Sequence, residues 1–224
     1  MSMATDRYHS AFALFAACVL CGCVSTKIVP VGRTVLSGFH GGSVTLSHRE
    51  KPSFSAGTAG KATFALIGAV AMISAGNAIV RENEIADPAV YIGQTLAADL
   101  ERDNALTPVD STYATDTRDI SQLAKQYATA NLLLDVETIN WSFIYFPTNW
   151  THYRVIYSAK LRLIDTRQAK LIADGFCSRV PEETPDAPTH DELLRNNAAR
   201  LKQELKIAAD RCVSEFRSKV LQQS

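Results

Sequence analysis

The chain has 224 residues, enough for one domain with an extension, and its 23 lysines and arginines balance its 23 aspartates and glutamates. A neutral chain lacks the clustered positive charge that displaces counterions from nucleic acid, so we expect no nucleic-acid partner. A hydrophobic content of 46% argues against wholesale disorder.

The amino terminus is predicted to be a signal peptide, residues 1–22. Arg7 precedes an uncharged run from Ser10 to Leu20, which has the length of a signal-peptide core and is too short to span a bilayer comfortably. The run ends in Leu20-Cys21-Gly22-Cys23, which resembles the lipobox of bacterial lipoproteins. The resemblance implies cleavage before Cys23, lipid on that cysteine and, because residue 24 is not Asp, attachment to the periplasmic face of the outer membrane. The alternative is a plain cleaved leader without lipid.

The cysteines of the mature chain predict a disulfide bond. If Cys23 carries lipid, Cys177 and Cys212 are the two thiols that remain in an oxidising compartment, one at the end of a predicted strand and one on the last helix. The alternative is two buried free cysteines. No metal site or cofactor is predicted, because the mature chain has no CxxC motif and its histidines are scattered.

The mature chain is predicted to begin with a tether, residues 23–42, followed by a single domain, residues 43–224. Glycines and a proline interrupt any helix in the tether. The segment Ser43–Glu50 alternates apolar and polar residues, which predicts the first strand.

Residues 62–80 form an uncharged segment rich in Ala and Gly. As a helix it would be about 28 Å long, close to the thickness of a hydrocarbon layer, and its small residues would let helices approach closely. One interpretation is a helix, or a helical hairpin broken near Gly68, that inserts in the membrane or lines an oligomer. The other is a helix buried in the domain or packed across one face of the sheet.

The remaining elements predict an α+β fold. Asp87-Pro88 begins a helix to about residue 102, a short strand is expected within 104–110, and Asp116 or Thr117 caps a second helix. Three antiparallel strands follow, at about 130–145, 152–165 and 170–176. Thr189-His-Asp-Glu192 is a capping-box pattern that begins the last helix. We expect a mainly antiparallel sheet with the helices packed on one face.

Within the predicted sheet, a long strand and a hairpin lead to Leu161-Arg-Leu-Ile-Asp-Thr-Arg167 and then to another strand. This stretch, Ala130 to Phe176, is similar to the periplasmic α/β domain of curli-secretion and penicillin-binding-protein-activator lipoproteins. The resemblance implies an envelope domain of that kind and says nothing about activity.

No motif with catalytic spacing is present. Asp135 and Glu137 alternate on one strand and share a face, where they could do acid–base chemistry or be solvated or salt-bridged. The Ser55–Lys61 stretch resembles a phosphate-binding loop, but its first glycine is replaced by Ser55 and Ala62 follows the lysine. We therefore expect a protein that is not an enzyme.

Aromatic residues are dense around the predicted hairpin. They could form a binding surface for a partner, a glycan or a membrane interface, or they could be core residues packed across strands. The set comprises Trp141, Phe143, Tyr145, Phe146 and Trp150.

These observations predict an outer-membrane lipoprotein that acts as a non-enzymatic periplasmic adaptor or assembly factor. Its partners would be the membrane, through the lipid, and an envelope protein or a second copy of the chain. The alternatives are a membrane-inserted oligomer built from residues 62–80 and a glycan-binding or hydrolytic envelope protein that uses the aromatic face.

Overall fold

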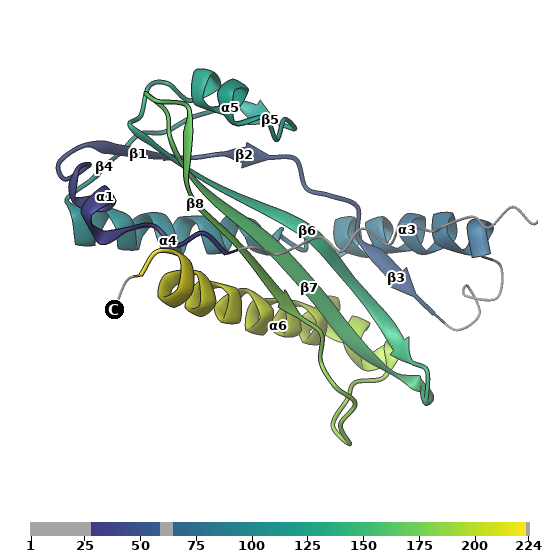
Figure 1. Ribbon diagram of the computed structural model, residues 1–224. Coiled ribbons are helices and arrows are strands. Elements are labelled where there is room, and N and C mark those ends of the chain that lie inside the picture. Colours follow the sequence, from purple (N-terminus) through teal and green to yellow (C-terminus); the bar gives the residue numbers. More distant parts are fainter. Residues whose placement is uncertain (1–27, 59–64, 223–224) are drawn as a thin grey trace, which may run out of the picture.

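The computed structural model describes residues 28–58 and 65–222, and it confirms the α+β fold class (Figure 1). The predicted signal peptide, the lipobox and Cys23 lie outside the described residues, as do residues 62–64. The helices are α1 (Arg33–Ser37), α3 (Ala65–Glu82), α4 (Pro88–Asn104), α5 (Ile120–Gln126) and α6 (His190–Glu215), followed by the π-helical turn η1 (Phe216–Val220).

The sheet is mixed. Its long strands β6 (Leu132–Phe146), β7 (Asn149–Asp165) and β8 (Lys170–Arg179) form the predicted antiparallel meander. Three short strands extend it in parallel pairings: β1 (Ser43–Leu46) and β3 (Ser55–Gly57) pair with β6, and β4 (Thr107–Pro108) pairs with β1. A separate two-stranded sheet joins β2 (His48–Arg49) to β5 (Ala114–Thr115).

A bulge in β6 keeps one face of this long strand apolar. Before the bulge the residues that belong to the main core have even numbers, such as Leu132 and Leu134, and after it they have odd numbers, such as Trp141 and Phe143. The pairing register slips between Thr138 and Asn140, which inserts one extra residue. Side chains alternate between the two faces of a strand with a period of two. One inserted residue therefore moves every later odd-numbered side chain to the face that even-numbered side chains occupied before the bulge.

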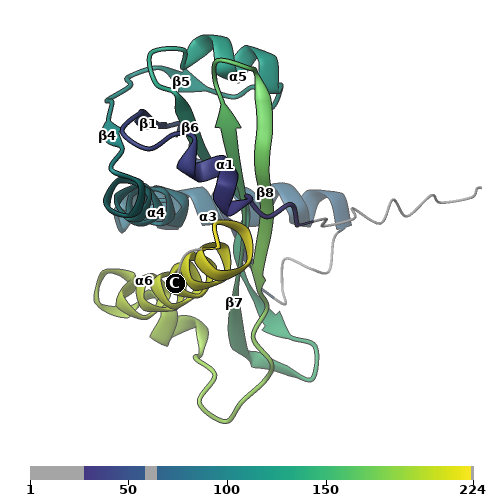
Figure 2. The same ribbon diagram turned by 60° about the vertical axis from the view of Figure 1, so that its left-hand side comes forward.

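The helices of the main core lie on one face of the sheet, as predicted, and the short helix α5 adds cover on the other. Helices α4 and α6 pack on the face that carries the main core, while α5 covers the opposite face at one end of the sheet (Figure 2). The smaller core there joins Leu123 and Tyr127 to Leu133 of β6. The cap of α5 is Asp119, whose side chain accepts a hydrogen bond from the Gln122 amide, and not Asp116 or Thr117 as predicted.

Helix α3 is anchored at its carboxyl-terminal half and extends past β3 away from the body of the domain (Figure 1). Gly76 lies against the backbone of Phe54, where an added Cβ would be 2.1 Å from the carbonyl oxygen. Asn77 accepts a hydrogen bond from the Phe54 amide at 2.9 Å. In the half that extends away, Val70 is 70% exposed and Ile73 is 42% exposed. Among the residues described, no helix combines the length and apolar character that crossing a membrane requires.

Part of the predicted tether belongs to the folded domain. Val29 exchanges two backbone hydrogen bonds with Asp174 of β8, and Val31, Leu36 and Phe39 are buried in the main core. The folded unit therefore includes residues 28–42, which the sequence placed before the domain.

Helix α6 begins as predicted and then bends. Thr189 and Glu192 form the expected capping box. The next turn is interrupted at Asn196, Asn197 and Ala198, which have left-handed φ values of 55°, 57° and 53°. The first turn therefore closes against the hairpin end of the sheet, where His190 contacts the rings of Phe143 and Tyr153, and the longer part runs along the sheet towards η1.

Candidate functional site

The two predicted disulfide cysteines are bonded to each other. Cys177 of β8 and Cys212 of α6 are both buried, with their Cα atoms 5.4 Å apart. The bond joins the longest helix to the edge strand of the meander, as predicted from the compartment. No group of three or more potential metal-ligating side chains occurs within residues 28–58 and 65–222.

The aromatic set does not form one exposed surface. Trp141, Phe143 and Phe146 are 1%, 0% and 3% exposed, so the core interpretation is correct for these three residues. The Trp141 indole donates to the Pro52 carbonyl at 3.0 Å. Trp150 is 66% exposed near the hairpin tip, where its ring packs edge-on against Tyr145. A binding face built from all five residues is therefore excluded, and Trp150 remains as an isolated surface aromatic.

The two strand carboxylates are held in ion pairs. Asp135 is fully buried and accepts from Arg49 at 2.6 Å and from Arg162 at 2.8 Å, while Ser47 donates to it at 2.6 Å. Burial alone would raise the pKa of Asp135, but the two guanidinium groups outweigh it and hold the pKa below its ordinary value. Glu137 is paired with Arg118. The salt-bridged interpretation of these carboxylates is correct, and their oxygens are already occupied by donors.

A cleft of about 330 Å³ lies between α4 and α6. Its floor is apolar, because Ile85, Leu205 and Ala209 are almost fully buried beneath it. Lys202 and Lys206 lie one helical turn apart on α6, so their side chains share the same rim.

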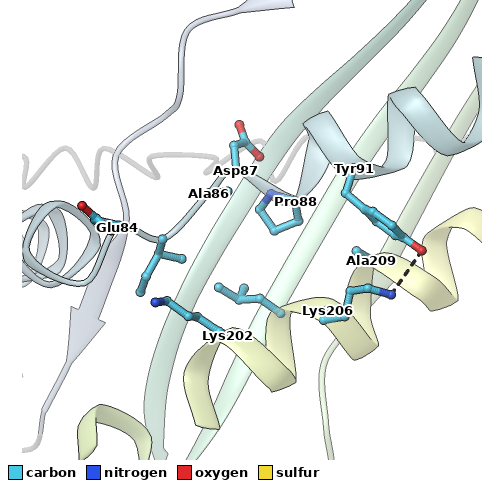
Figure 3. Close-up of a pocket in the computed structure, with 10 residues that line it drawn as sticks. Glu84, Ala86, Asp87, Pro88, Tyr91, Lys202, Lys206 and Ala209 are labelled. Carbon is cyan, nitrogen blue, oxygen red and sulfur yellow. Dashed lines mark hydrogen bonds between the residues drawn. The ribbon is translucent and has the colours of Figure 1, made fainter. Parts of the chain in front are cut away.

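Tyr91 connects the two helices across this cleft. Its hydroxyl donates to Asp210 at 2.9 Å and accepts from the Lys206 ammonium at 3.1 Å, as Figure 3 shows for the lysine. The same ammonium lies 4.2 Å from the centre of the Tyr91 ring. Hydrogen bonds to Asp210 and Tyr91 raise the pKa of Lys206 above its ordinary value, so this ammonium stays protonated at physiological pH, where it is paired with Asp210 at 2.6 Å.

The start of α4 is fixed beneath the cleft by a buried polar chain. Asp87 caps the helix by accepting from the Ala89 amide at 2.9 Å, and the Thr138 hydroxyl donates to the same carboxylate oxygen. Thr138 is in turn 3.0 Å from the Tyr157 hydroxyl. Burial raises the pKa of both Asp87 and Tyr157. The carboxylate belongs to the helix cap, so we assign it a structural role.

The cleft can hold an apolar group that has an anionic group beside it. Its lining brings together residues that are more than 100 positions apart in the chain, such as Tyr91 and Lys206. Sequence patterns predicted both helices but not the cleft. The one local indication was the spacing of the two lysines on the helix, which is typical of an ordinary solvated face.

No known protein family and no curated protein sequence matches the chain. Among solved structures, it is similar to the PelC dodecamer from Paraburkholderia phytofirmans, with 10% identity, a TM-score of 0.34 and coverage of 81% of this chain and 90% of that chain. For lipoprotein GNA1162 from Neisseria meningitidis the identity is 15% and the TM-score 0.29, over 78% of this chain and 99% of that chain. For the LpoB C-terminal domain from Salmonella enterica the identity is 14% and the TM-score 0.23, with coverage of 64% of this chain and 87% of that chain.

Proposed function

We propose that the protein is a membrane-anchored envelope lipoprotein, lipidated on Cys23, whose domain is a non-enzymatic adaptor or assembly factor. The observation that carries the adaptor role is the α4–α6 cleft, with its apolar floor and lysine-bearing rim. The lining favours one occupant: a segment of a partner protein that inserts an apolar side chain over the floor and places a carboxylate beside Lys202, because Lys206 is already paired with Asp210.

Two features support the envelope location. The Leu20-Cys21-Gly22-Cys23 sequence has the residue types of a lipobox at the end of a leader. The disulfide between Cys177 and Cys212 is a type of bond that persists in oxidising compartments and is rare in the cytosol. Val24, in place of Asp, supports the periplasmic face of the outer membrane.

The anchor is tested by metabolic labelling with palmitate in a Gram-negative host. We expect label in the wild type and none in Cys23→Ser, which should also leave the membrane fraction. Cys21→Ser is the matched control, because serine suits that lipobox position, and it should keep the label. A Cys23→Ser protein that is still labelled and still membrane-bound would show that the anchor is elsewhere.

The adaptor role is tested by crosslinking in intact envelopes. Lys202→Glu reverses a charge on the rim of the cleft, and we expect it to abolish the crosslinked species that the wild type forms. Lys125→Glu makes the same change on α5, on the opposite face of the sheet, and should preserve them. Crosslinks that persist unchanged in both variants would exclude the cleft as the partner site.

A second candidate is self-association through α3, favoured by the exposure of Val70 and Ile73 on its outer half. From Ala65 to Val80 the helix has no charged residue, so a second copy could pack against it without like-charge repulsion. Ile73→Glu should then yield smaller particles in sedimentation. Ile207→Glu is the control, because Ile207 on α6 is 43% exposed, nearly as much as Ile73, and this change should leave the particle size unaltered. Equal sedimentation of the two variants and the wild type would rule this candidate out.

A further inference from the structure

A second cavity, of about 280 Å³, lies at the opposite end of α6 from η1, beside the proline-rich loop 181–188. Three arginines from three elements line it: Arg154 of β7, Arg179 at the end of β8, and Arg200 of α6. The loop is held at this place by backbone contacts, since the Tyr153 amide donates to the Pro188 carbonyl at 2.8 Å. The cavity is thus closed on one side by a loop whose end is bonded to β7, and it is separate from the α4–α6 cleft.

The three arginines have hydrogen-bonding capacity that the protein does not use. Arg154 Nε, Arg179 Nη1 and Arg200 Nε are buried nitrogen atoms without a hydrogen-bond partner among the described residues. Within residues 28–58 and 65–222, six buried side-chain polar atoms lack a hydrogen-bond partner, and these nitrogens are three of them. Buried donors are usually paired, and leaving them unpaired is unfavourable. The three nitrogens have almost no accessible surface, so an acceptor that enters the cavity would satisfy them once the arginine side chains shift towards it.

The charge around the cavity is also unbalanced once the two solvent-exposed loop carboxylates are set apart. Glu204 is 8% exposed and pairs at 2.9 Å with both Arg179 and Arg200, so two guanidinium groups share one carboxylate. Arg154 lies over the Phe146 ring, 5.4 Å from its centre. Without the loop, three arginines and one glutamate leave a formal excess of two positive charges, which Glu182 and Asp186 of the lining offset in the formal count. The loop carboxylates at the rim, Glu182 and Asp186, are exposed to solvent, which screens them.

We propose that this cavity binds a phosphate group. A phosphate monoester dianion carries the charge that the excess requires, and its several oxygens accept from guanidinium groups in a bidentate manner. The group could belong to a free phosphate ester or to a lipid headgroup, and both present the same chemistry to Arg179 and Arg200. Glu204 would stay in place, and the bound phosphate would compete with its carboxylate for hydrogen bonds from Arg179 and Arg200.

The test is calorimetric titration of the full-length chain in detergent with inorganic phosphate at about pH 8, where phosphate is a dianion. We expect saturable binding that Arg200→Gln weakens by about tenfold or more, since one charge-assisted pair is lost. Arg211→Gln is the matched control. It removes the same charge from the same helix and also breaks a pair with a glutamate four residues later, but it lies outside the cavity.

A third variant gives a change of opposite sign. Glu204→Gln removes the competing carboxylate and should tighten phosphate binding, which simple loss of folding cannot do. Glycerol 3-phosphate and dihexanoyl phosphatidic acid then distinguish the sources: a lipid preference appears as tighter binding of the latter, with dihexanoyl phosphatidylcholine as the control without a monoester. The proposal is overturned if the wild type shows no binding up to about 10 mM phosphate, or if Arg200→Gln and Arg211→Gln have equal effects.

Discussion

Removing the disulfide between Cys177 and Cys212 should cost a large part of the domain's stability. The two cysteines are 35 residues apart in sequence. In the chain-entropy model, opening a loop of that length returns about 13 cal/mol/K to the unfolded chain, so the free energy of unfolding falls by about 3.8 kcal/mol at 25 °C. With a urea m value of about 2 kcal/mol per molar, the unfolding midpoint of Cys177→Ala/Cys212→Ala should fall by about 2 M.

Urea unfolding followed by tryptophan fluorescence measures this change, because buried Trp141 reports on the core between the sheet and its helices. Wild type in reductant is the control that keeps both sulfur atoms, and its midpoint should fall to near that of the double variant. Reductant should leave the double variant unchanged. The reasoning fails if oxidised wild type and the double variant unfold within about 0.5 M urea of each other, or if the exported protein contains two free thiols.

Three further changes test other parts of the structure. Asp135→Asn leaves two buried arginines without their shared carboxylate and should lower the free energy of unfolding at pH 7 by about 3–5 kcal/mol. Because the pKa of Asp135 is lowered in the folded state, this stabilisation is complete above about pH 4 and is lost as the pH falls through the folded pKa. The urea unfolding midpoints of wild type and Asp135→Asn should therefore converge in acid. A difference in midpoint that does not change with pH would contradict the lowered pKa of Asp135. Gly76→Ala forces a methyl group against the Phe54 carbonyl and should cost about 1–3 kcal/mol and speed amide exchange in α3, whereas Ser74→Ala, at an exposed position of the same helix, should change neither. Thr189→Ala removes the capping box of α6 and should cost about 1 kcal/mol by thermal unfolding, and an unchanged midpoint would show that the cap is dispensable.

The local elements of the fold were predictable because local chemistry determines them. Alternation placed β7 and β8 to within a few residues, and Thr189 with Glu192 marked the start of α6. The disulfide followed from compartment and cysteine count. The helix from Asp87-Pro88 was also correct, since a cap and a proline act within one turn.

The features that were missed depend on residues far apart in sequence. The parallel pairing of β1 with β6 joins Val44 to Leu132, and no pattern in either segment specifies the other. The ion pair of Arg49 with Asp135 spans 86 residues. Both cavities likewise arise where separate elements meet. The bend in α6 was missed because Asn196 and Asn197 are only weak signs of a left-handed backbone.

The place where residue 29 joins the sheet determines how far the domain can extend from an anchored end. Val29 bridges to Asp174, which pairs with Arg162 of β7, and Asn149 at the tip of the hairpin precedes Arg162 by 13 residues. At roughly 3.3 Å per residue that length of strand spans about 43 Å. If lipid is attached at Cys23, the five residues to Ile28 add at most about 18 Å. The hairpin tip, and Trp150 with it, could then meet a partner up to about 60 Å from the bilayer surface, and strand length contributes most of that reach.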